Sequence, residues 1–336
     1  MYEEAESASE AVRAQLEQDS QQIEALGEVI RRLAPRAVIT CARGSSDHAA
    51  TYAKYLIETR ARVLTSSAAP STSSVYGIDQ DLRHCLFVAI SQSGRSPDLL
   101  ASVEAAKSSG ATIVSLCNTP DSPLVSMSDH AINLRAGPER SVAATKSFLA
   151  TLAALARLVA AWTRNTSLQA SLQNLPDLMD QAWTLDWSSA LPLLESAEHL
   201  YVLGRGLGLG AAQEIALKCK ETCGLHAESF SSAEVRHGPF TLLGPRFPAF
   251  LLAQNDPTRA GVEQLAAELA GLKVPVLAAG TSPIQGVRSL STVDSPAELA
   301  PILLVQSAYR LIATLSVRRG FDPDRPANLS KVTETV

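Results

Sequence analysis

The sequence predicts an α/β protein with two doubly wound parallel-sheet lobes that are related by internal duplication. Strand-like apolar runs end at Gln92 and Thr119, and similar runs end at Gln254 and Thr281, 162 positions later in both cases. The Arg-Gly turn that begins at Arg43 has a counterpart at the same offset. The runs are continuously apolar, as strands buried on both faces are, and helical patterns separate them. One offset shared by three strand–turn boundaries indicates a repeated unit.

The chain divides into five predicted segments. A helical lead-in ends before Pro35, and the last segment carries two prolines without core periodicity. The stretch from Phe148 to Trp162 is strongly apolar but has only 15 residues, with Arg157 at its middle. A membrane span needs about 20 residues, so we expect a buried helix there. The segments are a lead-in (1–34), a first lobe (35–165), a helical connector (166–196), a second lobe (197–322) and a C-terminal active-site tail (323–336).

Composition excludes several classes of protein. The net charge is −5 with Lys and Arg scattered singly, whereas a nucleic-acid binder shows a basic patch. The acidic N-terminus lacks the apolar core of a signal peptide. Five cysteines without CxxC pairing are typical of reduced thiols in a cytoplasmic protein. We therefore expect a cytoplasmic protein whose partners are neither nucleic acid nor membrane.

Hydroxyl-bearing residues follow the second apolar strand of the first lobe, where the turn from Ser91 to Pro97 reads SQSGRSP. A helix that begins near Pro97 leaves free N–H groups, which can donate to phosphate oxygens together with the serine hydroxyls. The turn 42–47, ARGSSD, converges on the same edge, where open parallel sheets bind ligands. An ordinary Ser/Gly turn with a serine cap is the alternative, but two converging turns favour an anion site.

The second lobe offers weaker binding signals. Its equivalent turn, 253–256, reads AQND, which lacks the serines and adds a carboxylate, so we expect a single phosphate site. Residues 206–211, GLGLGA, fit the dinucleotide-binding glycine pattern, but the acid expected about 20 residues on is missing. We interpret these glycines as close helix–strand packing. Neither a metal-ligand spacing nor a Walker A pattern occurs, so we expect no cofactor and no metal.

Candidate acid–base residues lie in the second lobe. Lys218 and Glu221 are three apart and share a helix face, and His237 precedes Gly-Pro. A solvated surface pair and a loop histidine are the simpler interpretations of each signal alone. Together, a carboxylate, an imidazole and a phosphate turn supply what aldose–ketose chemistry needs: ring opening and proton transfer between adjacent carbons.

These runs resemble the SIS (sugar isomerase) family. Within it they are most similar to the isomerase half of glucosamine-6-phosphate synthase and to its free-standing relatives. The resemblance covers nearly the whole chain and implies two flavodoxin-like lobes. It rests on five runs: SQSG at 91–94, ERSVAATK at 139–146, KCKE at 218–221, EVRHGP at 234–239 and DRPANLSK at 324–331.

The resemblance also implies which residues hold the substrate. The sugar phosphate would be bound by hydroxyl and amide side chains on the two turns of the first lobe, namely Ser45, Ser91, Gln92, Ser93 and Ser96. The rest of the substrate pocket would be lined by Gly44, Glu139 and Val142, with Gln92 also facing it.

Four further positions carry catalytic roles by the same resemblance. Glu221 would move the proton between the first and second carbons, and Lys218 would hold the open-chain sugar. His237 would open the ring and would reach the site from a neighbouring subunit. Lys331, on an ordered tail, would lie at the site; in the synthase this lysine forms a Schiff base with fructose-6-phosphate. A homodimer with shared active sites is therefore expected.

Two departures from the synthase pattern shape the functional hypothesis. The chain shows no N-terminal glutaminase domain, and its second residue is Tyr2 rather than a cysteine nucleophile. The phosphate turn reads Gly-Arg-Ser-Pro-Asp where the synthase typically has Gly-Glu-Thr-Ala-Asp, and this version resembles stand-alone deaminases. Arg95 would add a contact to the phosphate or face solvent.

We therefore expect an enzyme, a glucosamine-6-phosphate deaminase that releases fructose-6-phosphate and ammonia from a phosphosugar substrate. Three alternatives stay open. The substrate could be a fructosamine phosphate or galactosamine-6-phosphate, the chain could be the isomerase part of a glucosamine-6-phosphate synthase, or it could be a sugar-phosphate sensor. About 33 residues precede the first strand, too few for the DNA-binding domain that such sensors usually carry.

Overall fold

The computed structural model describes residues 1–78 and 80–331, and the chain forms two compact units. The first-sheet unit contains Glu10–Glu139, Lys146–Asn174 and the end of the chain from Ser330. The second-sheet unit contains Met1–Ser9, Arg140–Thr145 and Leu175–Leu329.

The first-sheet unit is built on five parallel strands in the order β2-β1-β3-β4-β5. Strand β1 pairs with β2 on one side and with β3 on the other. The strand order therefore runs outward from β1 in both directions, as in a doubly wound sheet. The β3 strand is buried along its whole length, as its continuous apolar sequence predicts. The strands are β1 (Ala37–Cys41), β2 (Thr65–Ser67), β3 (Cys85–Ser91), β4 (Thr112–Cys117) and β5 (His130–Asn133).

The second-sheet unit repeats this topology. Its five strands are also parallel and follow the order β10-β9-β8-β6-β7, the same order when β6 is matched with β1. The predicted duplication and the doubly wound α/β fold are thereby confirmed. The strands are β6 (His199–Gly204), β7 (His226–Ser231), β8 (Ala249–Leu252), β9 (Val276–Ala279) and β10 (Val287–Leu290).

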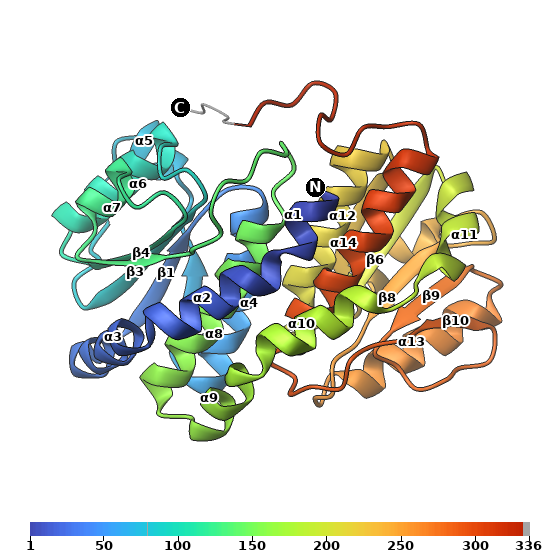
Figure 1. Ribbon diagram of the computed structural model, residues 1–336, viewed down its shortest axis with the longest axis horizontal. Coiled ribbons are helices and arrows are strands. Elements are labelled where there is room, and N and C mark those ends of the chain that lie inside the picture. Colours follow the sequence, from blue (N-terminus) through green and yellow to red (C-terminus); the bar gives the residue numbers. More distant parts are fainter. Residues whose placement is uncertain (79, 332–336) are drawn as a thin grey trace. The chain divides into compact units, whose positions relative to one another are not determined.

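Helices cover both faces of the first sheet (Figure 1). The α6 helix packs against β3 and β4 on one face, and α4 packs against β1, β3 and α8. The predicted buried helix is α8, and its side chains from Ser147 to Trp162 are buried. The helices are α2 (Ala8–Gln18), whose first two residues belong to the other unit, α3 (Ser20–Leu33), α4 (Ser45–Arg60), α5 (Ser71–Ser74), α6 (Pro97–Ser108), α7 (Pro123–Met127), α8 (Lys146–Thr163) and α9 (Thr166–Gln173).

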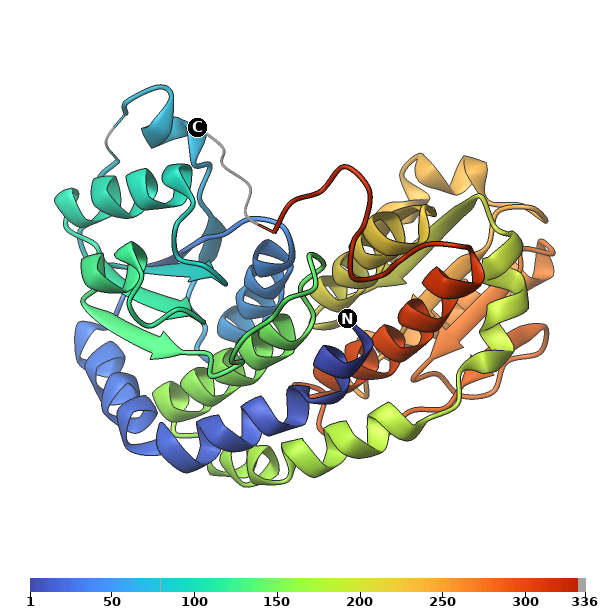
Figure 2. The same ribbon diagram turned by 45° about the horizontal axis from the view of Figure 1, so that its top comes forward.

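The second-sheet unit is covered in the same way, and Figure 2 shows α14 beside α12. In the described part of the chain, α14 alone is long and apolar enough to span a membrane, but 78% of its most apolar window is buried, so it is a core helix. The helices are α1 (Tyr2–Glu6), α10 (Leu175–Thr184), α11 (Leu191–Ser196), α12 (Gly208–Cys223), α13 (Arg259–Gly271) and α14 (Ala300–Arg318), with 3₁₀ turns η1 (Ser188–Ala190), η2 (Glu234–Arg236) and η3 (Pro239–Leu242).

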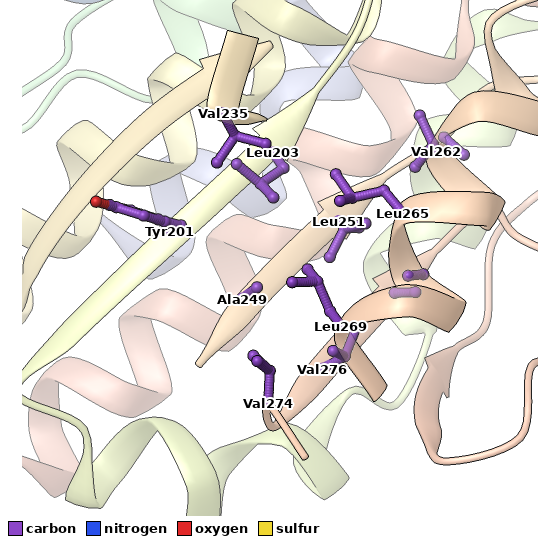
Figure 3. Packing of buried hydrophobic residues seen from close by; sticks show 13 residues of the cluster. Tyr201, Leu203, Val235, Ala249, Leu251, Val262, Leu265, Leu269, Val274 and Val276 are labelled. Atoms are coloured by element: carbon purple, nitrogen blue, oxygen red, sulfur yellow. The ribbon is translucent and has the colours of Figure 1, made fainter. Parts of the chain in front are cut away.

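The core of the second-sheet unit lies between its sheet and α13 (Figure 3). Val262, Leu265 and Leu269 recur at helical spacing on α13 and meet Leu251 of β8 and Val276 of β9. This packing holds α13 against β8 and β9, whose carboxyl ends carry the turns of this unit.

Candidate active site

The phosphate turn predicted from the sequence lies at the switch point of the first sheet, where β3 ends and α6 begins. The Ser91 hydroxyl accepts a 2.9 Å hydrogen bond from the Gly94 amide. Gly94 has a φ of +64°, and a Cβ there would lie 2.3 Å from Ser122 Oγ, so the turn requires glycine. Ser96 occupies the N-cap position of α6, but its hydroxyl makes no capping hydrogen bond. The turn thus holds its shape through Ser91 and leaves the Ser96 hydroxyl unused by the helix.

The second predicted turn follows β1, next to β3 in the sheet. Gly44, with a φ of +56°, caps α4, which begins at Ser45, and no side-chain capping bond is made. Because β1 and β3 are neighbours, the amino ends of α4 and α6 both start at this edge, with their dipoles favouring an anion. Burial raises the pKa of Asp47 above its ordinary value, and His48 and Arg43 partly oppose this shift.

An ion pair joins the two turns. Arg43 donates from Nε and Nη2 to Oδ2 of Asp98 at 2.8 and 2.7 Å, while the Asp98 side chain is 1% exposed. The other carboxylate oxygen of Asp98 accepts from the Leu99 amide at 2.8 Å. Two guanidinium donors thus share one oxygen of a buried carboxylate, and this charge-assisted contact joins the α4 and α6 turns. Sequence reasoning assigned no role to either residue.

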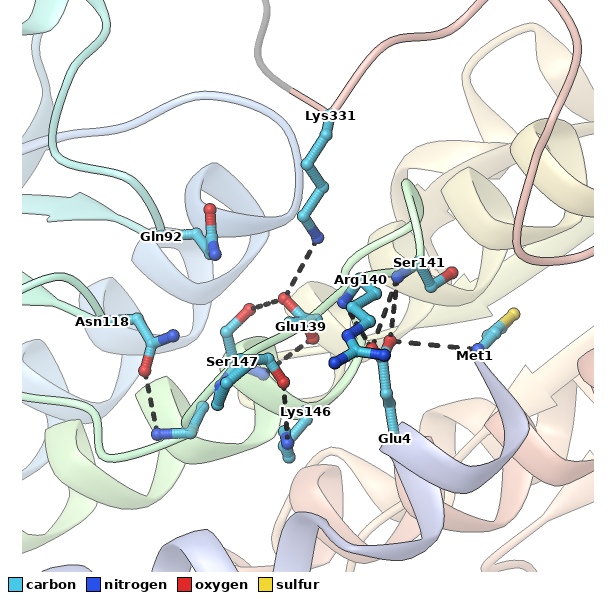
Figure 4. Close-up of polar contacts among 12 residues, drawn as sticks. Met1, Glu4, Gln92, Asn118, Glu139, Arg140, Ser141, Lys146, Ser147 and Lys331 are labelled. Atoms are coloured by element: carbon cyan, nitrogen blue, oxygen red, sulfur yellow. Dashed lines mark hydrogen bonds and ion pairs between the residues drawn. The ribbon is translucent and has the colours of Figure 1, made fainter.

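Glu139, predicted to line the pocket, is fully buried at its side chain and receives bonds from α8 (Figure 4). The Ser147 hydroxyl donates to Oε2 at 2.7 Å and the Ser147 amide to Oε1 at 3.2 Å. The ammonium of Lys331 lies 3.5 Å from Oε2. The structure therefore brings two predicted residues, Glu139 and Lys331, together in the first-sheet unit, and Ser147 positions the carboxylate.

The acid–base candidates of the second-sheet unit lie on α12. Lys218 is 1% exposed, and its ammonium lies 2.5 Å from Glu221 and 3.5 Å from Glu214. Tyr309 of α14 donates a 2.8 Å hydrogen bond to Glu214. Glu214 is fully buried, whereas 21% of the Glu221 side chain is exposed. The pair is therefore not a solvated surface pair: a buried cation sits between an enclosed carboxylate and an accessible one.

His237 lies on an exposed loop that follows β7. Its amide donates to the Glu234 carbonyl at 2.8 Å, and Gly238, with a φ of +124°, turns the chain into η3. Across residues 1–78 and 80–331, no hydrogen bond joins the His237 side chain to Glu221. An exposed imidazole on a projecting loop can still reach another molecule.

The tail is attached to the segment that carries Val142. The Val142 amide donates to the Asp324 carbonyl at 3.2 Å, and the Ser141 hydroxyl donates to the Pro323 carbonyl at 3.4 Å. The N-terminal ammonium of Met1 pairs with the Asp324 carboxylate. The predicted tail runs to 336; its last five residues, 332–336, lie outside the described residues.

At the second switch point, between β6 and β8, Gln254 is hydrogen-bonded within the turn. The amide of Gln254 donates to the Arg205 carbonyl, to Asp256 and to Thr258 at 2.8 to 2.9 Å. A Cβ at Gly208 would lie 2.6 Å from Gln254 Oε1. The Gln254 amide and the Asp256 carboxylate are thus hydrogen-bonded to each other within this turn. Gly208 therefore packs closely against Gln254, as expected of this run, and Gly206 has a φ of +59°.

Among the side chains of residues 1–78 and 80–331, no three His, Cys, Asp or Glu gather in a way that could hold a metal ion.

Comparison with known proteins places these features in a family. The SIS domain model matches residues 34–161 and again 193–317. A glutamine–fructose-6-phosphate aminotransferase (isomerizing) of Pyrobaculum aerophilum is 36% identical over 327 residues, covering 92% of this chain and 53% of that protein. The corresponding Aeropyrum pernix protein is 34% identical over 309 residues, covering 86% and 49%. The chain spans about half the length of the curated relatives it matches.

Solved structures agree with this assignment. A protein of Silicibacter pomeroyi DSS-3 named "putative phosphosugar isomerase" has a TM-score of 0.93 at 39% identity, covering 96% of this chain and 99% of that one. The C-terminal domain of glucosamine-fructose-6-phosphate aminotransferase from Francisella tularensis has a TM-score of 0.84 at 27% identity, covering 97% and 96%. With both of its lobes matched by the same domain model, the chain belongs to the SIS domain family.

Proposed function

We propose that the chain catalyses proton transfer between C1 and C2 of a hexosamine 6-phosphate, the isomerase step that links glucosamine-6-phosphate to the imine of fructose-6-phosphate. The observation that carries the proposal is the Lys218–Glu221 pair on α12. The Glu221 carboxylate is accessible, and the buried ammonium of Lys218 holds it in place. The curated relatives, glutamine–fructose-6-phosphate aminotransferases, support this choice of substrate.

The reaction follows from the chemistry of these groups. His237 protonates the ring oxygen and opens the sugar, acting in a homodimer on the site of the second copy. The Glu221 carboxylate takes the proton from C2 of the open-chain aldehyde and returns it to C1, while a proton passes from the amino nitrogen to the oxygen at C1, which converts a 2-amino aldehyde into a 2-imino alcohol. Lys218 orients Glu221 through their 2.5 Å contact and stabilises the oxygen at C1 as charge develops there.

Phosphate recognition is assigned to the first-sheet unit. The hydroxyls of Ser45, Ser93 and Ser96, the Gln92 amide and the helix starts at α4 and α6 supply donors for the phosphate oxygens. Ser91 acts by holding the turn through Gly94. Lys331 is the amine that takes up the ketose: it adds to the C2 carbonyl of fructose-6-phosphate, and water leaves.

Deamination is the second candidate, because it uses the same imine. Water adds at C2 of the 2-imino alcohol, ammonia leaves, and fructose-6-phosphate remains. The turn sequence Arg95-Ser96-Pro97, with Pro97 opening α6, favours it through its resemblance to stand-alone deaminases. Fructosamine phosphates and galactosamine-6-phosphate are the substrate alternatives, and a cytoplasmic location suits all of them.

One experiment tests both candidates. The purified chain is incubated with glucosamine-6-phosphate in D₂O, and NMR follows deuterium at C2 while ammonia and fructose-6-phosphate are assayed. Deuterium incorporation without ammonia is expected of the isomerase step alone, and equimolar ammonia and fructose-6-phosphate are expected of a deaminase. The same assay with the other amino-sugar phosphates fixes the substrate. If no amino-sugar phosphate exchanges its C2 proton although it binds, the enzyme proposal fails and a sensor is the better explanation.

A further inference from the structure

A cavity lies in the first-sheet unit, and its lining includes no residue of the phosphate turn. It has a volume of about 270 Å³ and is bounded by residues of α2, α3, α8 and α9. Its polar lining consists of Ser20, Glu24, Arg157, Gln169 and Gln173, and apolar side chains close the remainder. At about 30 Å³ per water molecule, the cavity has room for roughly nine waters, which suits a ligand the size of an amino acid.

Arg157 is the unusual group in this lining. It projects from α8, whose other side chains between Ser147 and Trp162 are small, apolar or hydroxyl-bearing, and it is only 6% exposed. Its Nη2 donates a long hydrogen bond of 3.3 Å to Ser20 Oγ. Its Nη1 is buried and has no hydrogen-bonding partner among the described residues. Burial lowers the pKa of this guanidinium, which reflects the cost of holding its charge there.

The nearby acids, Asp19 and Glu24, are hydrogen-bonded to residues other than Arg157. Asp19 receives Nε and Nη2 of Arg135 at 2.6 and 2.5 Å, a bidentate pair. Glu24 accepts the amide of Gln169 at 2.7 Å. Neither carboxylate is hydrogen-bonded to Arg157, although both raise its pKa at a distance. Arg157 is thus a buried guanidinium on the wall of a cavity, with one donor that has no partner among the described residues, a feature that folding alone does not favour.

We propose that this cavity binds a small molecule through a carboxylate group, with Arg157 as the anchor. A guanidinium presents two parallel donors that match the two oxygens of a carboxylate. The single positive charge of Arg157 balances a monoanion, whereas a phosphate dianion would bring a second negative charge toward Glu24. The amides of Gln169 and Gln173 are placed to contact the rest of the ligand.

The test uses sodium propionate as the monocarboxylate probe and sodium phosphate as the competing anion, each against sodium chloride at equal ionic strength. Binding is measured by calorimetry and by the melting temperature of the full chain. Propionate should raise the melting temperature of the wild type, and Arg157→Met should weaken propionate binding by at least about tenfold. Arg164→Met, which removes an exposed arginine from the end of the same helix, should bind propionate as the wild type does.

A second variant keeps the test decisive if Arg157→Met does not fold. Gln173→Glu places a carboxylate on the cavity wall, so it should occupy Arg157 internally, raise the melting temperature without added ligand and abolish the propionate effect. The proposal is overturned if propionate binds Arg157→Met or Gln173→Glu as tightly as the wild type. It is also overturned if Arg157→Met loses more affinity for phosphate than for propionate. Because the phosphate turn is untouched in every variant, failure here leaves the proposed function standing.

Discussion

The ammonium of Lys218 lies 2.5 Å from the carboxylate of Glu221 although only 1% of the Lys218 side chain is exposed. The same ammonium lies 3.5 Å from Glu214, which is itself fixed by Tyr309. The buried ammonium therefore lies between two carboxylates that differ in their exposure to solvent. Glu214 is hydrogen-bonded to Tyr309 of α14 and is fully buried, whereas 21% of the Glu221 side chain is exposed and Glu221 is the base that we propose.

Replacing Glu221 with glutamine should remove proton transfer and spare the fold. We expect deuterium exchange at C2 of glucosamine-6-phosphate to fall by about 10²-fold or more, because an amide cannot act as the base. Glu228→Gln, at an exposed position of β7, is the matched control and should exchange at the wild-type rate. Retention of most of the exchange by Glu221→Gln would show that another group carries the proton.

Replacing Lys218 with methionine should destabilise the second-sheet unit. The change leaves the fully buried Glu214 carboxylate without its cation, which costs ~3–5 kcal/mol in the free energy of unfolding. Lys220→Met, two positions along the same helix at an exposed site, should change stability little. The double variant Lys218→Met/Glu214→Gln should recover much of the loss, as measured by urea denaturation. If the double variant is no more stable than Lys218→Met, the buried charge is not the cause.

Lys331 can be tested by trapping. In the free chain its ammonium is held 3.5 Å from Glu139, and 28% of its side chain is exposed, so it can reach a ligand. Fructose-6-phosphate with borohydride should reduce the Schiff base and add one sugar phosphate to the tail, as detected by peptide mass spectrometry. Lys331→Met should lose the adduct and lower the melting temperature, because the buried Glu139 carboxylate loses its cation, and Lys146→Met should retain the adduct. An adduct on another lysine would contradict the assignment.

The sequence predicted the sheet architecture and the turns because these are local patterns. Continuous apolar runs and a single offset sufficed for the two sheets, and Gly94 with its serines indicated the turn between β3 and α6, while phosphate binding there stays a prediction. The Arg43–Asp98 pair could not be read in this way, since the two residues are 55 positions apart and meet only because β1 and β3 are neighbours. Likewise, the i, i+3 spacing of Lys218 and Glu221 fits a surface pair equally well until α14 covers α12.

The shape of the phosphate turn should depend on Gly94. Gly94→Ala forces an L-residue to a φ of +64° and places its Cβ 2.3 Å from Ser122 Oγ. We expect the strain and the overlap together to cost ~2–4 kcal/mol. Gly137→Ala is a matched control, with the same φ of +64° but no heavy atom within 4 Å, and should cost only ~1–2 kcal/mol. Equal losses in the two variants, measured by chemical denaturation, would show that contact with Ser122 does not restrict the turn.

The raised pKa values of the buried thiols should make the free energy of unfolding depend on pH in the alkaline range. Burial raises the pKa of Cys41 from the ordinary 9.0 to about 12 and that of Cys223 to about 11. Between pH 9 and 11 the unfolded chain therefore ionises these thiols while the folded chain keeps them protonated, so the free energy of unfolding should decrease as pH rises through this window.

At pH 8 both thiols should resist iodoacetamide until the chain is denatured, because the thiolate is the nucleophile. Cys41→Ala should lose less stability than the wild type between pH 8 and 10.5. A wild-type curve that matches the variant's over that range, or rapid alkylation of Cys41 in the folded chain, would show that this thiol is not held in its protonated form.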